Sequence, residues 1–166
     1  MIIPVAAAQM EIKTLQPDEN LKKAETFAAE AKEKGCEFIC YPEMFITGFF
    51  GRKNSDFLQT VPGEYTDALC GFAARYRIHI IAGSLLEIEN GNIYNTSVVI
   101  GDRGEIIGKY RKIRLWCGEK RYTTPGAQPG VFDTRWGKIG VEICWDLAFP
   151  EVSKKIALMG GRIIFC

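Results

Sequence analysis

Cys144 lies in the stretch GVEICWDLAFPEV, where a strand-like apolar run is followed at once by a helix start. A thiol at such a corner can serve as a nucleophile if a base, an orienting charge and oxyanion donors surround it. The free backbone N–H groups after the cysteine and the positive end of the helix would favour a thiolate and an oxyanion. A single cysteine is more often a buried structural thiol, so the hypothesis of a nucleophile depends on partners elsewhere in the chain.

The base that a cysteine hydrolase needs is not supplied by an obvious histidine. The single histidine, His79, lies in the strand-like run RIHIIAG, where it alternates with Ile78 and Ile80 and suits a structural role. The best carboxylate is Glu43 in YPEMF, because it follows a predicted strand and the preceding proline stiffens the exit. The alternative role of Glu43 is that of a solvated loop residue. If Cys144 is a nucleophile, we expect Glu43 to be its base.

A cation near the thiol could come from KYRKIRLW, which ends another predicted strand and contains Lys109, Arg111, Lys112 and Arg114. One ammonium from this group could lower the pKa of the thiol and later stabilise an oxyanion. The same residues could instead form an exposed basic strand end or a weak anion patch. Residue types alone leave the choice among these four cations open.

The elements expected from apolar periodicity place these groups at the ends of strands. Strands are predicted at 2–10, 37–41, 78–86, 93–100, 105–110, 131–134, 138–143 and 162–166. Helices are predicted to begin at Pro17, to include 69–76, and to begin again at Pro150 with Val152, Ile156 and Met159 on one face. Residues 44–63 are predicted to be a loop over a site. The order β-α-β-α-β, followed by hairpins, predicts a mixed α/β fold of layered sheets.

The composition bears on location and partners. With 166 residues, 47% hydrophobic and 25% charged, the chain resembles an ordinary globular domain, and one domain over 1–166 is predicted. The 21 basic and 20 acidic residues give a net charge of +1, so no electrostatic argument favours nucleic acid or a membrane as a partner. The N-terminus lacks signal-peptide features and no apolar run approaches a membrane span, so a cytoplasmic location is the simplest interpretation.

The six cysteines are scattered along the chain without a C-x-x-C pair. This pattern argues against a structural zinc site and against a small disulfide scaffold. We expect most of the cysteines to be reduced thiols in the core.

Three segments taken together resemble the three signature blocks of the nitrilase or carbon–nitrogen hydrolase family. They are YPEMFITGF, then KYRKIRLW with GEKRYTTPG, then GVEICWDLAFPEV, and they occur in the family's order and at spacings like the family's. The resemblance begins at PVAAAQM in the first predicted strand and covers the whole chain. It implies a nitrilase-like α-β-β-α sandwich, of which this chain would hold only part because family domains are considerably longer.

The resemblance also implies roles for individual residues. Glu43 matches the family's general base, Lys112 its catalytic lysine and Cys144 its nucleophile. The backbone N–H of Trp145 is implied as an oxyanion donor, and Glu119 matches a second glutamate that positions the substrate and the lysine. The resemblance implies no metal and no organic cofactor.

Two residues depart from the pattern of many members. Arg114 stands where histidine is common, and Ala148 stands where arginine is common. Both are expected near the pocket, so the resemblance does not name the substrate.

The implied reaction is hydrolysis of a non-peptide C–N bond in a small linear amide or N-carbamoyl compound, through a thioester and with release of ammonia. Alternatives within this class are a nitrilase and an amidase subunit that feeds ammonia to a synthetase. From a different class, the chain could be a non-catalytic binding or assembly fragment. We expect a domain that is incomplete at its C-terminus and whose apolar sheet face needs a missing half or a homo-oligomeric partner.

Overall fold

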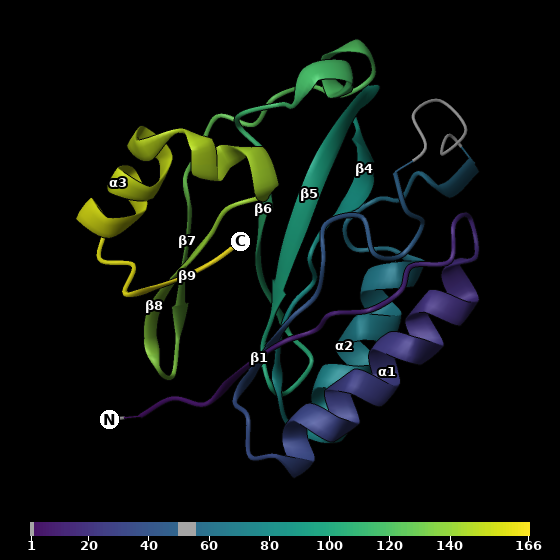
Figure 1. Ribbon diagram of the computed structural model, residues 1–166, viewed down its shortest axis with the longest axis vertical. Coiled ribbons are helices and arrows are strands. Elements are labelled where there is room, and N and C mark those ends of the chain that lie inside the picture. The colour runs from purple at the N-terminus through teal and green to yellow at the C-terminus, as the bar shows by residue number, and fades with distance from the viewer. Residues whose placement is uncertain (1, 50–55) are drawn as a thin grey trace.

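The computed structural model describes residues 2–49 and 56–166 (Figure 1). The helices are α1 (Pro17–Glu33), α2 (Glu64–Tyr76) and α3 (Pro150–Leu158). The strands are β1 (Val5–Ala7), β2 (Phe38–Cys40), β3 (His79–Ile81), β4 (Leu85–Glu89), β5 (Asn92–Ile100), β6 (Ile106–Arg111), β7 (Gly130–Thr134), β8 (Gly137–Val141) and β9 (Ile163–Phe165). Short 3₁₀ helices span Cys117–Arg121 and Cys144–Ala148.

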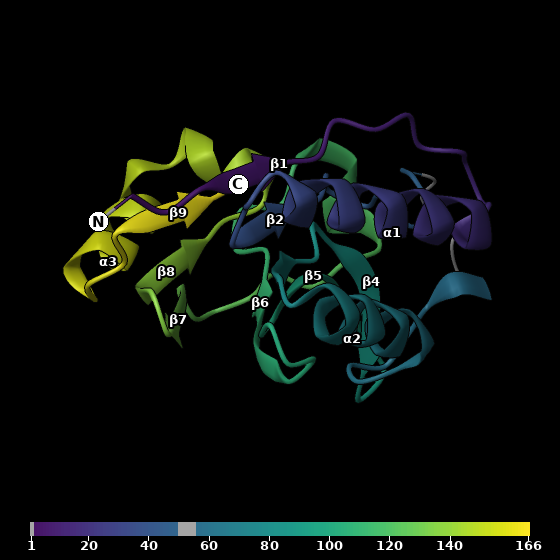
Figure 2. The ribbon, with the colours of Figure 1, turned by 90° about the horizontal axis from the view of Figure 1, so that it is seen from below.

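The described residues form two sheets between layers of helices. In the larger sheet β1, β2 and β3 run parallel, and β5 continues the sheet antiparallel to β3, β4 and β6. In the smaller sheet the order is β7-β8-β9. Figure 1 shows α1 and α2 outside the larger sheet and α3 outside the smaller one, and Figure 2 shows the same layers from below. The expected α-β-β-α order is confirmed.

Two apolar cores hold the layers together. The core between the larger sheet and its helices includes Ala24, Ala28, Leu69, Ala73, Ile80 and Val98. The core between the two sheets includes Phe38, Val99, Tyr110, Ile139, Val141 and Phe165. Because neighbouring residues of a strand point to opposite faces, Val98 and Val99 belong to different cores. The apolar faces of the larger sheet are therefore both covered.

The predicted helices are confirmed. In α1 the buried alanines Ala24, Ala28 and Ala31 lie on one face, where small side chains let the helix approach the sheet closely. Pro17 occupies the first turn, where its missing N–H costs nothing, and α3 begins in the same way at Pro150.

The single strand predicted over 78–86 is wrong, because the chain turns between β3 and β4. Gly83 has a φ of +50°, and a Cβ placed on it would lie 2.0 Å from the carbonyl oxygen of Pro42. This close crossing requires glycine and redirects the chain into a hairpin with β5. The turn brings the backbone of Gly83 directly against the segment that carries Glu43.

Other expectations need smaller corrections. The first strand covers only Val5–Ala7 rather than 2–10. Met159 is 51% exposed rather than packed inward, because α3 ends one residue before it. Of the predicted loop over 44–63, residues 50–55 lie outside the described residues, and the rest contains only a short 3₁₀ turn and an isolated bridge from Gln59 to Glu87.

The cysteines are free thiols, but the prediction that most lie in the core is wrong. Cys36, Cys40 and Cys70 are half-buried. The remaining three, Cys117, Cys144 and Cys166, are exposed. Among the described residues, no helix is both long and apolar enough to cross a membrane.

Candidate active site

Four side chains from different elements meet where strands of both sheets end. Glu43 follows β2, Lys112 follows β6, and Glu119 lies on the 3₁₀ helix Cys117–Arg121. The Nζ atom of Lys112 donates to Glu43 Oε1 at 2.7 Å and to Glu119 Oε2 at 2.8 Å. The side chain of Lys112 is only 1% exposed, so both ion pairs are shielded from water. The structure therefore brings three of the predicted site residues, Glu43, Lys112 and Glu119, into one cluster with Cys144 beside it.

Asn95 is a member of this cluster that the sequence analysis missed. Its Nδ2 atom donates to Glu43 Oε1 and to Glu119 Oε1, each at 2.8 Å. One amide group thus holds the two carboxylates on either side of the Lys112 ammonium. Asn95 lies inside β5, and its sequence context, YNTSVV, gives no local signal beyond a polar residue in an apolar strand.

The two carboxylates differ in their remaining hydrogen-bonding capacity. Glu119 accepts from Asn95 at one oxygen and from Lys112 and the Trp116 backbone N–H at the other, so both oxygens are occupied. At Glu43 the bonds from Lys112 and Asn95 both reach Oε1. The second oxygen of Glu43 is therefore the one that can accept a proton from a neighbouring group.

The charge of Lys112 is well anchored. Burial alone would lower the pKa of Lys112, but the hydrogen bonds and charges of Glu119 and Glu43 outweigh burial and raise the pKa above its ordinary value. Lys112 is therefore an ammonium at neutral pH. Two carboxylates share this single positive charge.

Cys144 begins the 3₁₀ helix that follows β8, with an unusual φ of +47°. Burial, the negative charge of Glu43 and a hydrogen bond to Glu43 raise the pKa of the Cys144 thiol to about 11, and the opposing effect of Lys112 is smaller. Lys112 lowers the pKa of the thiol, as expected for a nearby cation, but the other contributions outweigh it. Burial is the largest contribution to the net rise, followed by the charge of Glu43 and the hydrogen bond to it.

A buried aspartate joins the Cys144 turn to the end of β6. Asp146, which is 0% exposed, accepts hydrogen bonds from the Tyr110 hydroxyl at 2.7 Å and from the backbone N–H groups of Arg114 at 2.7 Å and Ile143 at 3.1 Å. Burial raises the pKa of Asp146 despite these bonds. The expected helix start directly after Cys144 is replaced by this five-residue turn, and α3 begins only at Pro150.

The remaining predicted residues lie around the cluster. The Trp145 side chain is 41% exposed and lies edge-on to Phe149, with ring centroids 6.2 Å apart. The guanidinium of Arg114 lies over the ring of Phe149, 4.8 Å from the ring centroid, and forms an ion pair with Glu151. These residues form a surface beside the cluster, and the oxyanion role of the Trp145 N–H stays a prediction.

His79 lies at the start of β3, away from the ends of the strands that carry the cluster. Its ring packs on Phe38, and Nδ1 contacts the backbone oxygen of Glu37 at 3.2 Å. Burial lowers the pKa of His79. His79 is thus a packed strand residue. Within the described part of the chain, no group of three or more histidine, cysteine or acidic side chains is arranged to hold a metal ion.

The fold and the cluster define a class, a layered α/β protein in which a lysine joined to two glutamates lies beside a cysteine, and comparisons with known proteins identify the family. The model of the carbon–nitrogen hydrolase family matches residues 4–166. A nitrilase of Pyrococcus abyssi is 40% identical, with 98% of this chain and 63% of that protein covered. The human omega-amidase NIT2 is 30% identical, with coverages of 96% and 61%.

Solved structures agree. Nit3 of Saccharomyces cerevisiae, a member of branch 10 of the nitrilase superfamily, matches with a TM-score of 0.88 at 29% identity over 98% of this chain and 62% of its own. An amidase from Nesterenkonia sp. matches with a TM-score of 0.88 at 25% identity over 98% and 63%. The chain belongs to the carbon–nitrogen hydrolase family, as its sequence blocks predicted. It spans about three fifths of the length of these relatives.

Proposed function

We propose that the protein hydrolyses the C–N bond of small linear amides or N-carbamoyl compounds, with Cys144 as the nucleophile. The observation that carries the proposal is the cluster in which Lys112 binds both Glu43 and Glu119 while Glu43 also contacts the thiol of Cys144. Family membership and the named amidase relatives support the same class of reaction.

The first step requires a base because the Cys144 thiol is neutral near pH 7. Its pKa of about 11 leaves little thiolate, so Glu43 takes the thiol proton as sulfur bonds to the carbonyl carbon. Glu43 Oε2 is suited to this transfer, because Oε1 is held by Lys112 and Asn95. A raised thiol pKa also gives a stronger nucleophile once the proton has left.

The oxyanion that forms needs positive charge and N–H donors. Lys112 has three N–H bonds and uses two of them on the carboxylates, so the third is available to the oxyanion. The backbone N–H of Trp145 serves as the second donor. Glu119 and Asn95 act as positioning residues, since they contact Lys112 and Glu43 rather than the reacting atoms.

Collapse of the tetrahedral intermediate breaks the C–N bond, and Glu43 returns its proton to the leaving nitrogen, which departs as ammonia. Cys144 then carries the acyl group as a thioester. Glu43 takes a proton from water, the hydroxyl oxygen bonds to the thioester carbon, and the carbon–sulfur bond breaks. The acid leaves and the thiol recovers its proton.

There are two alternatives to this function. The Pyrococcus abyssi relative is named a nitrilase, so a nitrile substrate is the second candidate. A non-catalytic binding or assembly fragment of the same fold is the third candidate. The expected homo-oligomer and cytoplasmic location stay predictions.

Release of ammonia from a panel of linear amides, N-carbamoyl amino acids and nitriles by the purified chain tests the proposal. We expect release from amides or carbamoyl compounds that disappears in Cys144→Ala and persists in Cys117→Ala, which removes another exposed thiol. Turnover of nitriles alone would favour the nitrilase. Release that is unchanged in Cys144→Ala would contradict the proposed nucleophile.

A further inference from the structure

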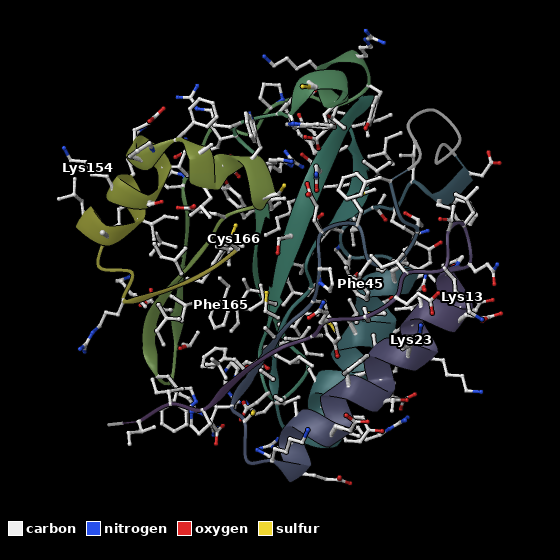
Figure 3. All side chains as sticks on the ribbon, in the orientation of Figure 1. Lys13, Lys23, Phe45, Lys154, Phe165 and Cys166 are labelled. Carbon is white, nitrogen blue, oxygen red and sulfur yellow. The ribbon has the colours of Figure 1, made fainter. Side chains whose placement is uncertain are left out.

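A small cavity lies between the two sheets, next to Glu43 and Cys144. Its volume is about 20 Å³, enough for one water-sized molecule. Its lining includes Glu43 and Cys144 of the cluster, Ser97, Glu142, apolar residues and the end of β9. Figure 3 labels Phe165, which ends β9 and belongs to the core between the sheets, and Cys166, which follows it.

Two buried polar side chains that line this cavity lack hydrogen-bond partners. Glu142 is 2% exposed, and neither of its carboxylate oxygens has a partner. Ser97 is 0% exposed, and its hydroxyl has no partner either. Buried polar groups are almost always paired, and a buried carboxylate without a partner is especially unfavourable. Two such groups in one cavity therefore indicate a site for a small molecule.

The missing partner must be a donor of hydrogen bonds. An ionised carboxylate can accept hydrogen bonds but cannot donate them, so Glu142 needs a donor. The Oδ1 atom of Asn95, on the same face of β5 as Ser97, is a further buried acceptor without a partner. Among the described residues that line the cavity, none is a lysine or an arginine. The charge of Glu142 is therefore not balanced by a cation inside the cavity.

We propose that this cavity is a site for ammonium, a water-sized cation with four N–H donors, and that it receives the nitrogen released at Cys144. The second part rests on the proposed function. Ammonia leaves carrying the proton that Glu43 returns, and it takes one more proton from water to become ammonium at neutral pH. The proposed ammonium site adjoins the place where ammonia is released, because Glu43 and Cys144 line the same cavity.

Size and hydrogen bonding distinguish ammonium from other small cations. Potassium has a similar radius but donates no hydrogen bonds. Methylammonium donates hydrogen bonds, but its methyl group exceeds the space for one water-sized molecule. A water molecule would satisfy the acceptors without responding to any of these salts.

Thermal unfolding of the purified chain tests the site without any need for activity. A ligand that binds only the folded state doubles the folding equilibrium constant when its concentration equals its dissociation constant. We expect Tm to rise in ammonium chloride above its value in equal concentrations of potassium chloride and methylammonium chloride. Equal Tm values in the three salts would overturn the proposal.

Variants assign the effect to the cavity. In Glu142→Gln the difference between ammonium and potassium should vanish, and in Ser97→Ala it should shrink. Glu30→Gln, the same substitution at an exposed position of α1, should retain the difference in full. If Glu142→Gln does not fold, Ser97→Ala decides the question. A difference that persists in both cavity variants would overturn the proposal.

Kinetics separate this proposal from the proposed function. In an active chain, ammonium should slow amide turnover more than potassium does, and Glu142→Gln should raise the inhibiting concentration about tenfold or more, as expected when a charged hydrogen-bond partner is lost. If amides are hydrolysed but ammonium does not raise Tm, the ammonium site is refuted and the proposed function is supported. If ammonium raises Tm but no substrate is hydrolysed, the cation site is supported and its proposed role in receiving a reaction product is refuted.

Discussion

At the scale of the residue, the cluster distinguishes two glutamates that the sequence presents as similar. Glu119 has both oxygens occupied by donors, whereas Glu43 keeps one oxygen for the Cys144 thiol. Hydrogen-bond saturation thus supports the proposal that Glu119 positions Lys112 and that Glu43 is the base. Neither role follows from the distance to Lys112, which is nearly the same for both.

Replacing Glu43 by glutamine should abolish the transfer of the thiol proton. We expect kcat to fall about 10²–10⁴-fold, the range that general bases contribute, while the circular dichroism spectrum stays that of the wild type. Glu119→Gln should lower kcat less, because Glu119 positions Lys112 and takes no proton. Wild-type turnover by Glu43→Gln, measured as ammonia release, would remove Glu43 from the mechanism.

The pH dependence of alkylation should report the environment of Cys144. Iodoacetamide reacts with the thiolate, so the rate at Cys144 should rise with pH to a midpoint near the pKa of about 11. Because the charge of Glu43 raises this pKa, Glu43→Gln should move the midpoint down, and Lys112→Ala should move it up. Peptide mass spectrometry gives the rate at each cysteine. Alkylation of Cys144 at neutral pH ahead of the exposed Cys117 would contradict the raised pKa.

At the scale of the element, the position of Glu43 depends on how closely two segments cross. The turn between β3 and β4 presses Gly83 against the backbone of Pro42, directly before Glu43. The turn of Cys144 is held in a similar way by Asp146, which links it to the end of β6. The site is therefore positioned by a close backbone crossing at Gly83 and by a buried side chain, Asp146, that links two segments.

Two glycine substitutions should have opposite effects on stability. Gly83→Ala places a methyl group 2.0 Å from the Pro42 oxygen at a positive φ, so we expect the free energy of unfolding to fall by more than about 1 kcal/mol and turnover to fall with it. Gly71, inside α2, has no atom within 4 Å of such a methyl, and Gly71→Ala should raise stability by about 0.5–1 kcal/mol. Urea unfolding measures both. Equal effects would show that the crossing at Gly83 is not tight.

At the scale of the whole molecule, the layers leave apolar side chains at the outer end of α3. Leu158 is 78% exposed and Met159 is 51% exposed. Ile164 on β9 is 38% exposed. β9 has a strand on one side only within the described residues, so this sheet also presents backbone hydrogen-bonding groups. A surface with exposed apolar side chains and an unpaired strand edge favours association of the chain with further copies of itself.

The native chain should therefore bind a hydrophobic dye and sediment faster as its concentration rises. Leu158→Lys together with Met159→Lys should lower dye fluorescence and weaken the association, because charges replace the exposed apolar groups. Both side chains point away from the core, so Tm should change little. A native chain that binds no dye and sediments as a monomer at every concentration would contradict this expectation.

The sequence by itself determined the helices and a mixed α/β fold from local patterns. Its three signature blocks identified the family, and that resemblance implied the order of the layers. Apolar spacing along α1 and α2 records which face packs on the sheet, and Pro17 and Pro150 mark first turns. The three signature blocks also singled out Glu43, Lys112 and Cys144 after predicted strands, and Glu119 in the segment between two of them. Residue types alone left Lys112 as one of four candidate cations, and only the resemblance to the family singled it out.

The tertiary structure alone decided the contacts between distant segments. It brought Asn95 between Glu43 and Glu119, and it divided the predicted strand at Gly83 because another backbone passes there. It also set the net pKa of Cys144, where burial and Glu43 outweigh the expected lowering by Lys112, since a pKa depends on every charge nearby and on burial. Each of these features depends on residues that are far apart in the chain but close in space. A local pattern of residues therefore cannot predict them.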